Sequence, residues 1–187
     1  MKKYISIIAL LSLFVIGCSE QTSINSPVNN VSTNEPNWIA LPQAEGMQVN
    51  QEASTSKLID GPKGGEITLK NSSNGGLFGT VTIDSKLQFP KGAFHGKVTF
   101  TVTHDDEACV STFGPSFVFN KDLTLNVKYS GVDLTGIDLT NVKFAYLAVD
   151  GSLQYAVNDE IVVDLSNGTL SVKNAKIRHF SRYGFIR

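Results

Sequence analysis

Residues 97–103 have the sequence Lys97-Val98-Thr99-Phe100-Thr101-Val102-Thr103, in which apolar and polar side chains alternate without a break. Successive side chains of a β-strand point to opposite faces, so this stretch predicts a strand with one face in a core and the other in water. The same alternation recurs at residues 66–69, 80–83, 86–89 and 123–129. We expect further strands at residues 66–69, 80–83, 86–89, 123–129, 143–149, 161–165, 169–172 and 180–186.

Turn-forming residues separate these runs. They lie at Gly64-Gly65, Asn74-Gly75-Gly76, Pro90-Lys91-Gly92, Asp150-Gly151 and Asn167-Gly168. The last two pairs are typical of two-residue hairpin turns. After residue 17, no segment of the sequence keeps the apolar stripe of a helix. The sequence therefore predicts an all-β domain at residues 58–187, folded as an antiparallel two-sheet sandwich, and about 130 residues suffice for one such core.

Residues 1–17 have the three zones of a signal peptide. Two lysines come first, an apolar run follows at residues 5–16, and the small residue Gly17 ends the segment. The apolar run is too short for a permanent membrane span. We therefore expect residues 1–17 to be removed during secretion.

The segment that ends in Cys18 resembles the lipobox of bacterial lipoproteins, with Val15 and Ile16 as variants and Gly17 and Cys18 as matches. This resemblance implies cleavage before Cys18 and acylation of its sulfur and its amine. Several acyl chains on one residue give stable anchoring on a membrane. Ser19, in place of Asp, follows the cysteine, which implies the outer membrane if the host has two membranes. The expected location is the cell envelope.

Residues 18–57 are rich in Ser, Asn, Gln and Thr and contain three prolines. Such a stretch buries too little apolar surface to offset the entropy lost on ordering. We expect the lipidated N-terminus to continue as a flexible linker as far as residue 57. Trp38-Ile39 is the apolar exception, and it docks on the domain, contacts a partner or stays exposed as part of the linker.

The charge of the secreted chain is close to neutral. Without Lys2 and Lys3, 14 basic residues stand against 17 acidic residues, which leaves a net charge of about −3. No basic surface is implied, so nucleic acid is not an expected partner. Cys109 has no second cysteine for an intramolecular disulfide once Cys18 is acylated. It is either a small buried apolar residue or a reactive thiol.

Acidic residues follow the strand at 97–103. Asp105, Asp106 and Glu107 come directly after His104 and could offer oxygen ligands to a hard cation such as calcium. The glycine and the alternating ligand spacing of a dedicated calcium loop are absent, so a solvated turn is the main interpretation. The sequence contains no hydrolase elbow, phosphate loop or dinucleotide motif. We therefore expect no cofactor and no metabolic activity.

Three segments, in this order, resemble the motifs of one known family. Thr80 to Phe94 (TVTIDSKLQFPKGAF) is similar to its glycine-rich strand followed by hydrophobic-x-(Ile/Phe)-Pro-x-Gly-Ala. Gly114 to Leu125 (GPSFVFNKDLTL) is similar to its Gly-Pro strand, with Asp122 where proline is usual, and Ile177 to Gly184 (IRHFSRYG) is similar to its last strand. The family is the ZU-five domain of zonula occludens proteins, netrin receptors and ankyrins. The resemblance implies a β-sandwich that serves as an interaction or structural module.

The resemblance also implies an alternative function. In some animal members of the family, a His-Phe-Ser sequence cleaves itself between Phe and Ser. Here the hydroxyl of Ser181 would attack the carbonyl of Phe180 with help from His179. The main expectation is a lipid-anchored binding or structural module of the envelope. Its expected partners are the membrane, through lipid on Cys18, and envelope proteins or glycans.

Overall fold

The computed structural model describes residues 36–42, 52–148 and 150–187. Cys18, the predicted signal peptide and the other linker residues lie outside this range. The described residues form eleven strands and one short 3-10 helix, η1 (Leu139–Asn141). None of their helical segments is long and apolar enough to cross a membrane. The all-β class predicted from the alternating pattern is confirmed.

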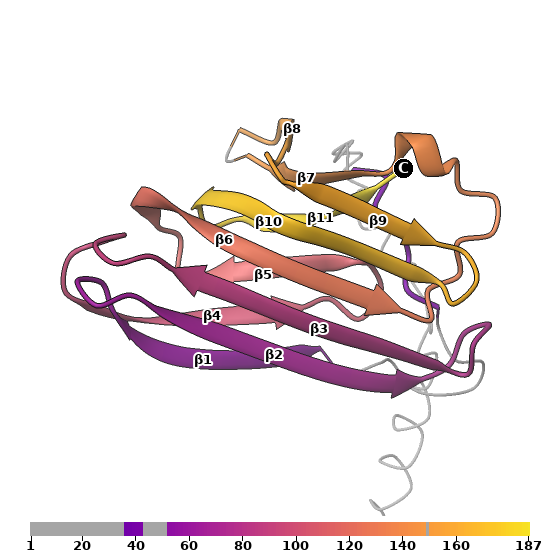
Figure 1. Cartoon of the computed structure of the whole chain (residues 1–187), viewed down its shortest axis with the longest axis horizontal. Coiled ribbons are helices and arrows are strands. Elements are labelled where there is room, and N and C mark those ends of the chain that lie inside the picture. Colours follow the sequence, from indigo (N-terminus) through magenta and orange to yellow (C-terminus); the bar gives the residue numbers. More distant parts are fainter. Residues whose placement is uncertain (1–35, 43–51, 149) are drawn as a thin grey trace, which may run out of the picture. The chain divides into compact units, whose positions relative to one another are not determined.

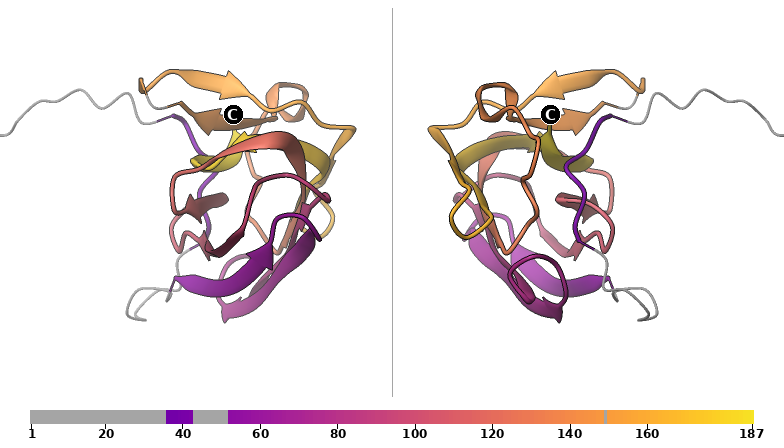
Figure 2. Two further views of the ribbon diagram at one scale, coloured as in Figure 1. Left: turned by 90° about the vertical axis from the view of Figure 1, so that its left-hand side faces the viewer. Right: turned by 90° about the vertical axis from the view of Figure 1, so that its right-hand side faces the viewer.

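The strands fall into the order β1 (Ala53–Asp60), β2 (Gly65–Asn74), β3 (Thr80–Phe89), β4 (Lys97–His104), β5 (Val110–Gly114), β6 (Val118–Ser130), β7 (Lys143–Leu147), β8 (Leu153–Tyr155), β9 (Glu160–Asp164), β10 (Thr169–His179) and β11 (Arg182–Ile186). They pair into two antiparallel sheets (Figure 1). One sheet has the strand order β1-β4-β5-β11-β7-β8 and the other has the order β2-β3-β6-β10-β9. Figure 2 views these two layers along the strands. The predicted two-sheet sandwich is confirmed.

Strand β4 shows how the alternating pattern builds the core. Its residues Phe100 and Val102 are 0% and 2% exposed, whereas Thr99, Thr101 and Thr103 are more exposed. Phe100 stacks on Phe89 of β3 in the opposite sheet, with ring centroids 5.1 Å apart. Full burial of each such side chain stabilises the fold by about 1.5–3 kcal/mol. Further rings join this aromatic core, namely Phe94, Phe113, Phe117, Phe119 and Phe180.

A segment from the expected linker belongs to the sandwich. Residues 36–42, here called the strap, lie between the end of β11 and the residues before β5, with bridges from Trp38 to Ile186 and from Ala40 to Ala108. Ile39 donates its amide to Phe185 at 2.8 Å, and its side chain is 1% exposed. Of the three interpretations of Trp38-Ile39, docking on the domain is the one observed. The domain also starts earlier than residue 58, because β1 begins at Ala53.

The two expected hairpins are present, but their turns are longer than two residues. Strands β7 and β8 pair as far as Leu147 and Leu153, and strands β9 and β10 pair as far as Asp164 and Thr169. Asp150 and Asp164 each accept the amide of the residue two positions later at 2.9 Å. Such side-chain to backbone hydrogen bonds stabilise turns of this longer kind. The two-residue prediction was therefore wrong in length.

The strand expected at residues 180–186 begins later. Strand β10 ends at His179 and β11 begins at Arg182, so Phe180 and Ser181 carry the chain from one sheet to the other. Phe180 is 4% exposed and packs in the aromatic core between the layers. The chain changes sheet at this point, so His179 and Ser181 are not neighbours on one face of one strand.

Candidate functional site

A cavity of about 320 Å³ is lined by residues of both sheets. Strands β7, β8 and β11 of one sheet and strands β6 and β10 of the other line it. It combines aromatic, charged and imidazole side chains, which distinguishes it from two other cavities of similar size in the described residues. We call it the tyrosine cavity.

Three tyrosines form the aromatic part of the tyrosine cavity. The rings of Tyr146 and Tyr183 lie 5.0 Å apart at 31°, and the ring of Tyr155 is 66% exposed at the mouth. The hydroxyl of Tyr146 donates to the side-chain oxygen of Gln154. Tyr183 donates to the carbonyl of His179 at 2.8 Å, and burial raises its pKa, so Tyr183 stays neutral at physiological pH. The wall is therefore fixed, and the exposed Tyr155 is available to a ligand.

Charged side chains from β6 and β10 form the other part. Arg178 donates through Nε to Asp122 Oδ1 at 2.9 Å, and this hydrogen bond raises the pKa of Arg178. Lys176 lies beside them on the same strand as Arg178 and adds a second positive charge. Lys176 and Arg178 carry two positive charges and Asp122 carries one negative charge, so these three residues give the cavity one net positive charge.

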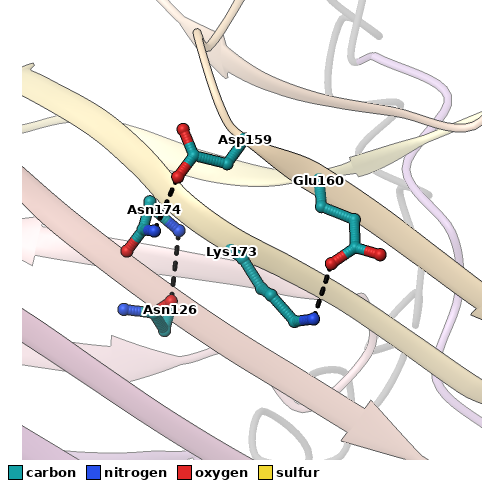
Figure 3. A network of polar contacts seen from close by, with 5 residues as sticks. All are labelled: Asn126, Asp159, Glu160, Lys173 and Asn174. Atoms are coloured by element: carbon teal, nitrogen blue, oxygen red, sulfur yellow. Dashed lines mark hydrogen bonds and ion pairs between the residues drawn. The ribbon is translucent and has the colours of Figure 1, made fainter.

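A β-bulge at Asn174 shapes this end of β10. Asn174 has a positive φ of 55°, and the register of β10 against β6 shifts between Val172 and Ala175. Its amide donates to Asn126 Oδ1 at 3.1 Å and its side chain donates to Asp159 Oδ2 at 2.7 Å (Figure 3). The pairing of β9 with β10 stops at Lys173, one residue before the bulge. Bulges end pairing and bend the strand locally, and here the cavity lies beyond that point.

The bulge yields a prediction for stability. A side chain other than Gly or Asn at positive φ is strained by about 1–2 kcal/mol. We expect Asn174→Ala to lower the free energy of unfolding by about 2 kcal/mol, because it adds strain and removes the bond to Asp159. Asn174→Gly relieves the strain and should cost about 1 kcal/mol less than Asn174→Ala. Urea unfolding measures both, and an Asn174→Ala variant as stable as Asn174→Gly would contradict this account.

The three residues of the implied self-cleavage make contacts with different parts of the sandwich. The hydroxyl of Ser181 donates to the carbonyl of Leu147 on β7. The ring of His179 lies edge-on to Tyr146, with centroids 4.9 Å apart, in the wall of the tyrosine cavity. The amide of Phe180 donates to the carbonyl of Phe117 at 2.9 Å. The geometry directs Ser181 to Leu147, so nucleophilic attack on Phe180 would first require this hydrogen bond to break.

The acidic residues after β4 form a loop that is closed by its own hydrogen bonds. Asp105 Oδ1 accepts the amides of Glu107 and Ala108 at 2.8 and 3.0 Å. Within residues 36–42, 52–148 and 150–187, no group of three or more His, Cys, Asp or Glu side chains is placed to hold a metal ion. This loop geometry gives the calcium alternative, which involves Asp105, Asp106 and Glu107, no support.

His104 points away from those acids and into the core. Its Nε2 lies 2.7 Å from Ser85 Oγ of the opposite sheet, and its Nδ1 lies 2.8 Å from Ser111 Oγ of β5. It is 1% exposed, and burial lowers its pKa to about 4. Ser85, His104 and Ser111 therefore form a neutral polar bridge between the two layers.

Cys109 lies close to this bridge and is 0% exposed. Burial raises the pKa of its thiol, with a smaller contribution from the charge of Asp105. The thiolate is the reactive form of cysteine, so this group is inert in the folded protein. Of the two interpretations of Cys109, the small buried apolar residue is the one observed.

The tyrosine cavity was not anticipated from the sequence. Its residues come from five strands and from the segment after β8, and no motif or spacing connects them. One signal was available at Asp122, which stands where the ZU-five family usually has proline. Asp122 pairs with Arg178. Comparisons with protein families, with curated proteins and with solved structures find no match. The ZU-five resemblance therefore stays a prediction.

Proposed function

We propose that this protein is a lipoprotein of the cell envelope, anchored through lipid on Cys18, whose β-sandwich binds a ligand in the tyrosine cavity. The sequence of residues 1–18 supports the anchor. The tyrosine cavity is the observation that carries the binding role, because aromatic faces and charged groups from both sheets converge there. No enzymatic step is part of this proposal.

The side chains of the cavity favour a glycan as the ligand. A tyrosine ring offers an apolar face for the C–H face of a sugar ring and a hydroxyl for its polar edge. Tyr155 is 66% exposed and so offers such a face without rearrangement. Arg178 and Lys176 supply donors that suit hydroxyl and carboxylate oxygens. A carboxylate-bearing glycan, such as the muropeptide unit of a bacterial wall, combines these features.

A titration with soluble muropeptides tests the binding role. We expect amide NMR signals of Tyr155, Val157 and Arg178 to shift on addition of muropeptide. Tyr155→Ala should weaken binding about tenfold, because one lost ring contact is worth about 1–1.5 kcal/mol. The protein's stability should be almost unchanged because the ring is exposed.

Leu77→Ala serves as the matched control, because Leu77 is 70% exposed and lies outside this cavity. We expect it to bind muropeptide as the unmodified protein does. Binding that Tyr155→Ala leaves intact, or signal shifts that avoid the cavity, would contradict the assignment of the ligand site.

A further inference from the structure

Exposed and partly buried apolar residues gather at the end of the sandwich opposite the tyrosine cavity. Leu77 and Phe78 lie in the β2–β3 turn, Ile137 in the loop after β6, and Leu165 in the β9–β10 turn. Leu77, Phe78 and Leu165 are 70%, 40% and 54% exposed. Together they line a second cavity of about 320 Å³. We call these three loops the end loops.

The end loops are held together as one surface. Gly131 and Val132, at the start of the loop that carries Ile137, donate their amides to Asn167 and Gly168 of the β9–β10 turn, each at 3.0 Å. A Cβ atom on Gly168 would lie 2.8 Å from the ring of Phe78, so this ring packs directly on the turn. The apolar side chains therefore project from a braced platform that spans three connections of the chain.

The N-terminal part of the chain joins the sandwich at this same end. Asn37 accepts the amide of Arg187 at 3.2 Å, and the strap continues past β5 to Pro42. A Cβ atom on Gly76 would lie 2.6 Å from Pro42 Cγ, so the strap ends against the β2–β3 turn. Figure 1 shows the strap, the C-terminus and the ends of β2, β6 and β9 on one side of the sandwich.

The length of chain before the strap limits how far this end can move from the anchor. Cys18 and Pro36 are 18 residues apart, which span at most about 60 Å when fully extended. A surface confined within such a distance of a membrane has an effective concentration of about a millimolar. Even a weak apolar interaction with lipid is then populated.

The two ends of the sandwich differ in charge. The tyrosine cavity holds Lys176, Arg178 and Asp122 among its apolar groups, and among residues 36–42, 52–148 and 150–187 no lysine or arginine lines the cavity between the end loops. Asp133 is the charged residue among the lining residues of the latter. Such an apolar surface favours the acyl chain and headgroup boundary of a lipid layer over a polar ligand.

Resting on the lipid anchor of the proposed function, we propose that the end loops dip into the membrane surface, with Leu77, Phe78 and Leu165 as the inserting side chains. The sandwich then stands with its strands pointing away from the membrane. The tyrosine cavity, at the far end of β10, faces the space where envelope polymers lie.

The charges beside the inserting residues specify the kind of lipid. Hydrogen bonds from neighbouring Thr and Ser side chains lower the pKa of Asp133, Asp138 and Asp164, so these carboxylates are charged at neutral pH. Lys128 offsets part of the charge of Asp164, and the remaining negative charges at the rim oppose approach to an anionic surface. The end loops are therefore suited to zwitterionic lipid, and added anionic lipid should reduce their insertion.

Site-specific labelling of the lipidated protein tests this orientation. Leu77→Cys is labelled with a polarity-sensitive fluorophore. The label reacts with this new thiol alone, because Cys109 is buried and Cys18 is acylated. In phosphatidylcholine vesicles, we expect a blue-shifted emission and quenching by lipids that carry a nitroxide near the headgroup. The matched control is Val118→Cys, because Val118 is 75% exposed and pairs with His179 at the far end of the sandwich. Its label should remain in water.

Replacing the other two inserting residues sharpens the result. Phe78→Ser together with Leu165→Ser should reduce the quenching of the Leu77→Cys label at least twofold while the protein still floats with the vesicles. Flotation with equal, water-like emission from the labels at residues 77 and 118 would overturn the inference and leave the anchor intact. A protein that does not float with vesicles at all would overturn the anchor, and the inference with it.

Discussion

Between pH 7 and pH 4, the free energy of unfolding of the His104→Gln variant is expected to fall by about 3 kcal/mol less than that of the unmodified protein. The folded-state pKa of His104 is about 4, below the ordinary value of 6.5, because burial disfavours the charged ring. Between these two values the unfolded chain binds the proton and the folded chain does not, so the free energy of unfolding falls as the pH falls. The difference of the two pKa values corresponds to about 3 kcal/mol.

Urea unfolding at pH 7, 6, 5 and 4 measures this effect. His104→Gln keeps a donor and an acceptor for Ser85 and Ser111, so the variant should still fold, and its loss of stability between pH 7 and pH 4 should be smaller. His95→Gln is the matched control, because His95 is exposed. We expect that variant to follow the unmodified protein. An unchanged pH dependence in His104→Gln would show that the polar bridge is not the acid-sensitive element.

Replacing Ile39 with alanine is expected to lower the free energy of unfolding by about 3 kcal/mol. Ile39 is 1% exposed, and removing a fully buried isoleucine side chain leaves a cavity that the surrounding atoms fill incompletely. The strap is held by hydrogen bonds on both sides, from Ile39 to Phe185 and from Cys109 to Ile39, each at 2.8 Å. The strap therefore acts as part of the sandwich, although residues 43–51 separate it from the strands in the sequence.

The measurement is urea unfolding of a Cys18→Ser form, which avoids the lipid. Val118→Ala should change stability by less than about 0.5 kcal/mol, because Val118 is 75% exposed. A chain that starts at residue 58, the boundary expected from the sequence, lacks the strap and most of β1, and we expect no cooperative transition from it. A cooperative transition from that short chain, or an Ile39→Ala variant as stable as the Val118→Ala variant, would refute this role of the strap.

The sequence predicted strands from apolar alternation, as at β4, or from short apolar runs, as at β9, and it missed β1, which has neither pattern. Strand β4 was predicted because each second residue is apolar, and the structure buries that face. Strand β1 has the sequence ASTSKLID, which lacks this pattern. It is an edge strand paired antiparallel with β4, and two hydroxyl pairs link their side chains, with Ser54 2.9 Å from Thr103 and Ser56 2.7 Å from Thr101. Such polar pairing is invisible to a search for apolar periodicity.

The tyrosine cavity could not be predicted for a different reason. Tyr155 and Arg178 are brought together by the pairing of the strands and by the bulge at Asn174, which sets the register of β10. A non-glycine residue at positive φ leaves little trace in a single sequence. His104 illustrates the opposite error, because its acidic neighbours suggested an exposed loop, whereas strand alternation already placed it on the buried face with Phe100 and Val102.

The two ends of the sandwich carry the functional account. The end loops and the strap lie where the chain from Cys18 joins the domain, and the tyrosine cavity lies at the other end of β10. This arrangement gives the proposed anchor a consequence beyond location, because it would present the cavity to envelope polymers.

The central claim is that the mature chain begins at an acylated Cys18. The most direct test is the intact mass of the protein extracted with detergent from the membranes of cells that express it. We predict one species whose mass equals residues 18–187 plus a diacylglyceryl group and an amide-linked acyl chain, uncut between Phe180 and Ser181. A chain that retains residues 1–17, or one that starts elsewhere without lipid, would contradict the account of the anchor. Loss of the mass of residues 181–187 would instead establish self-cleavage.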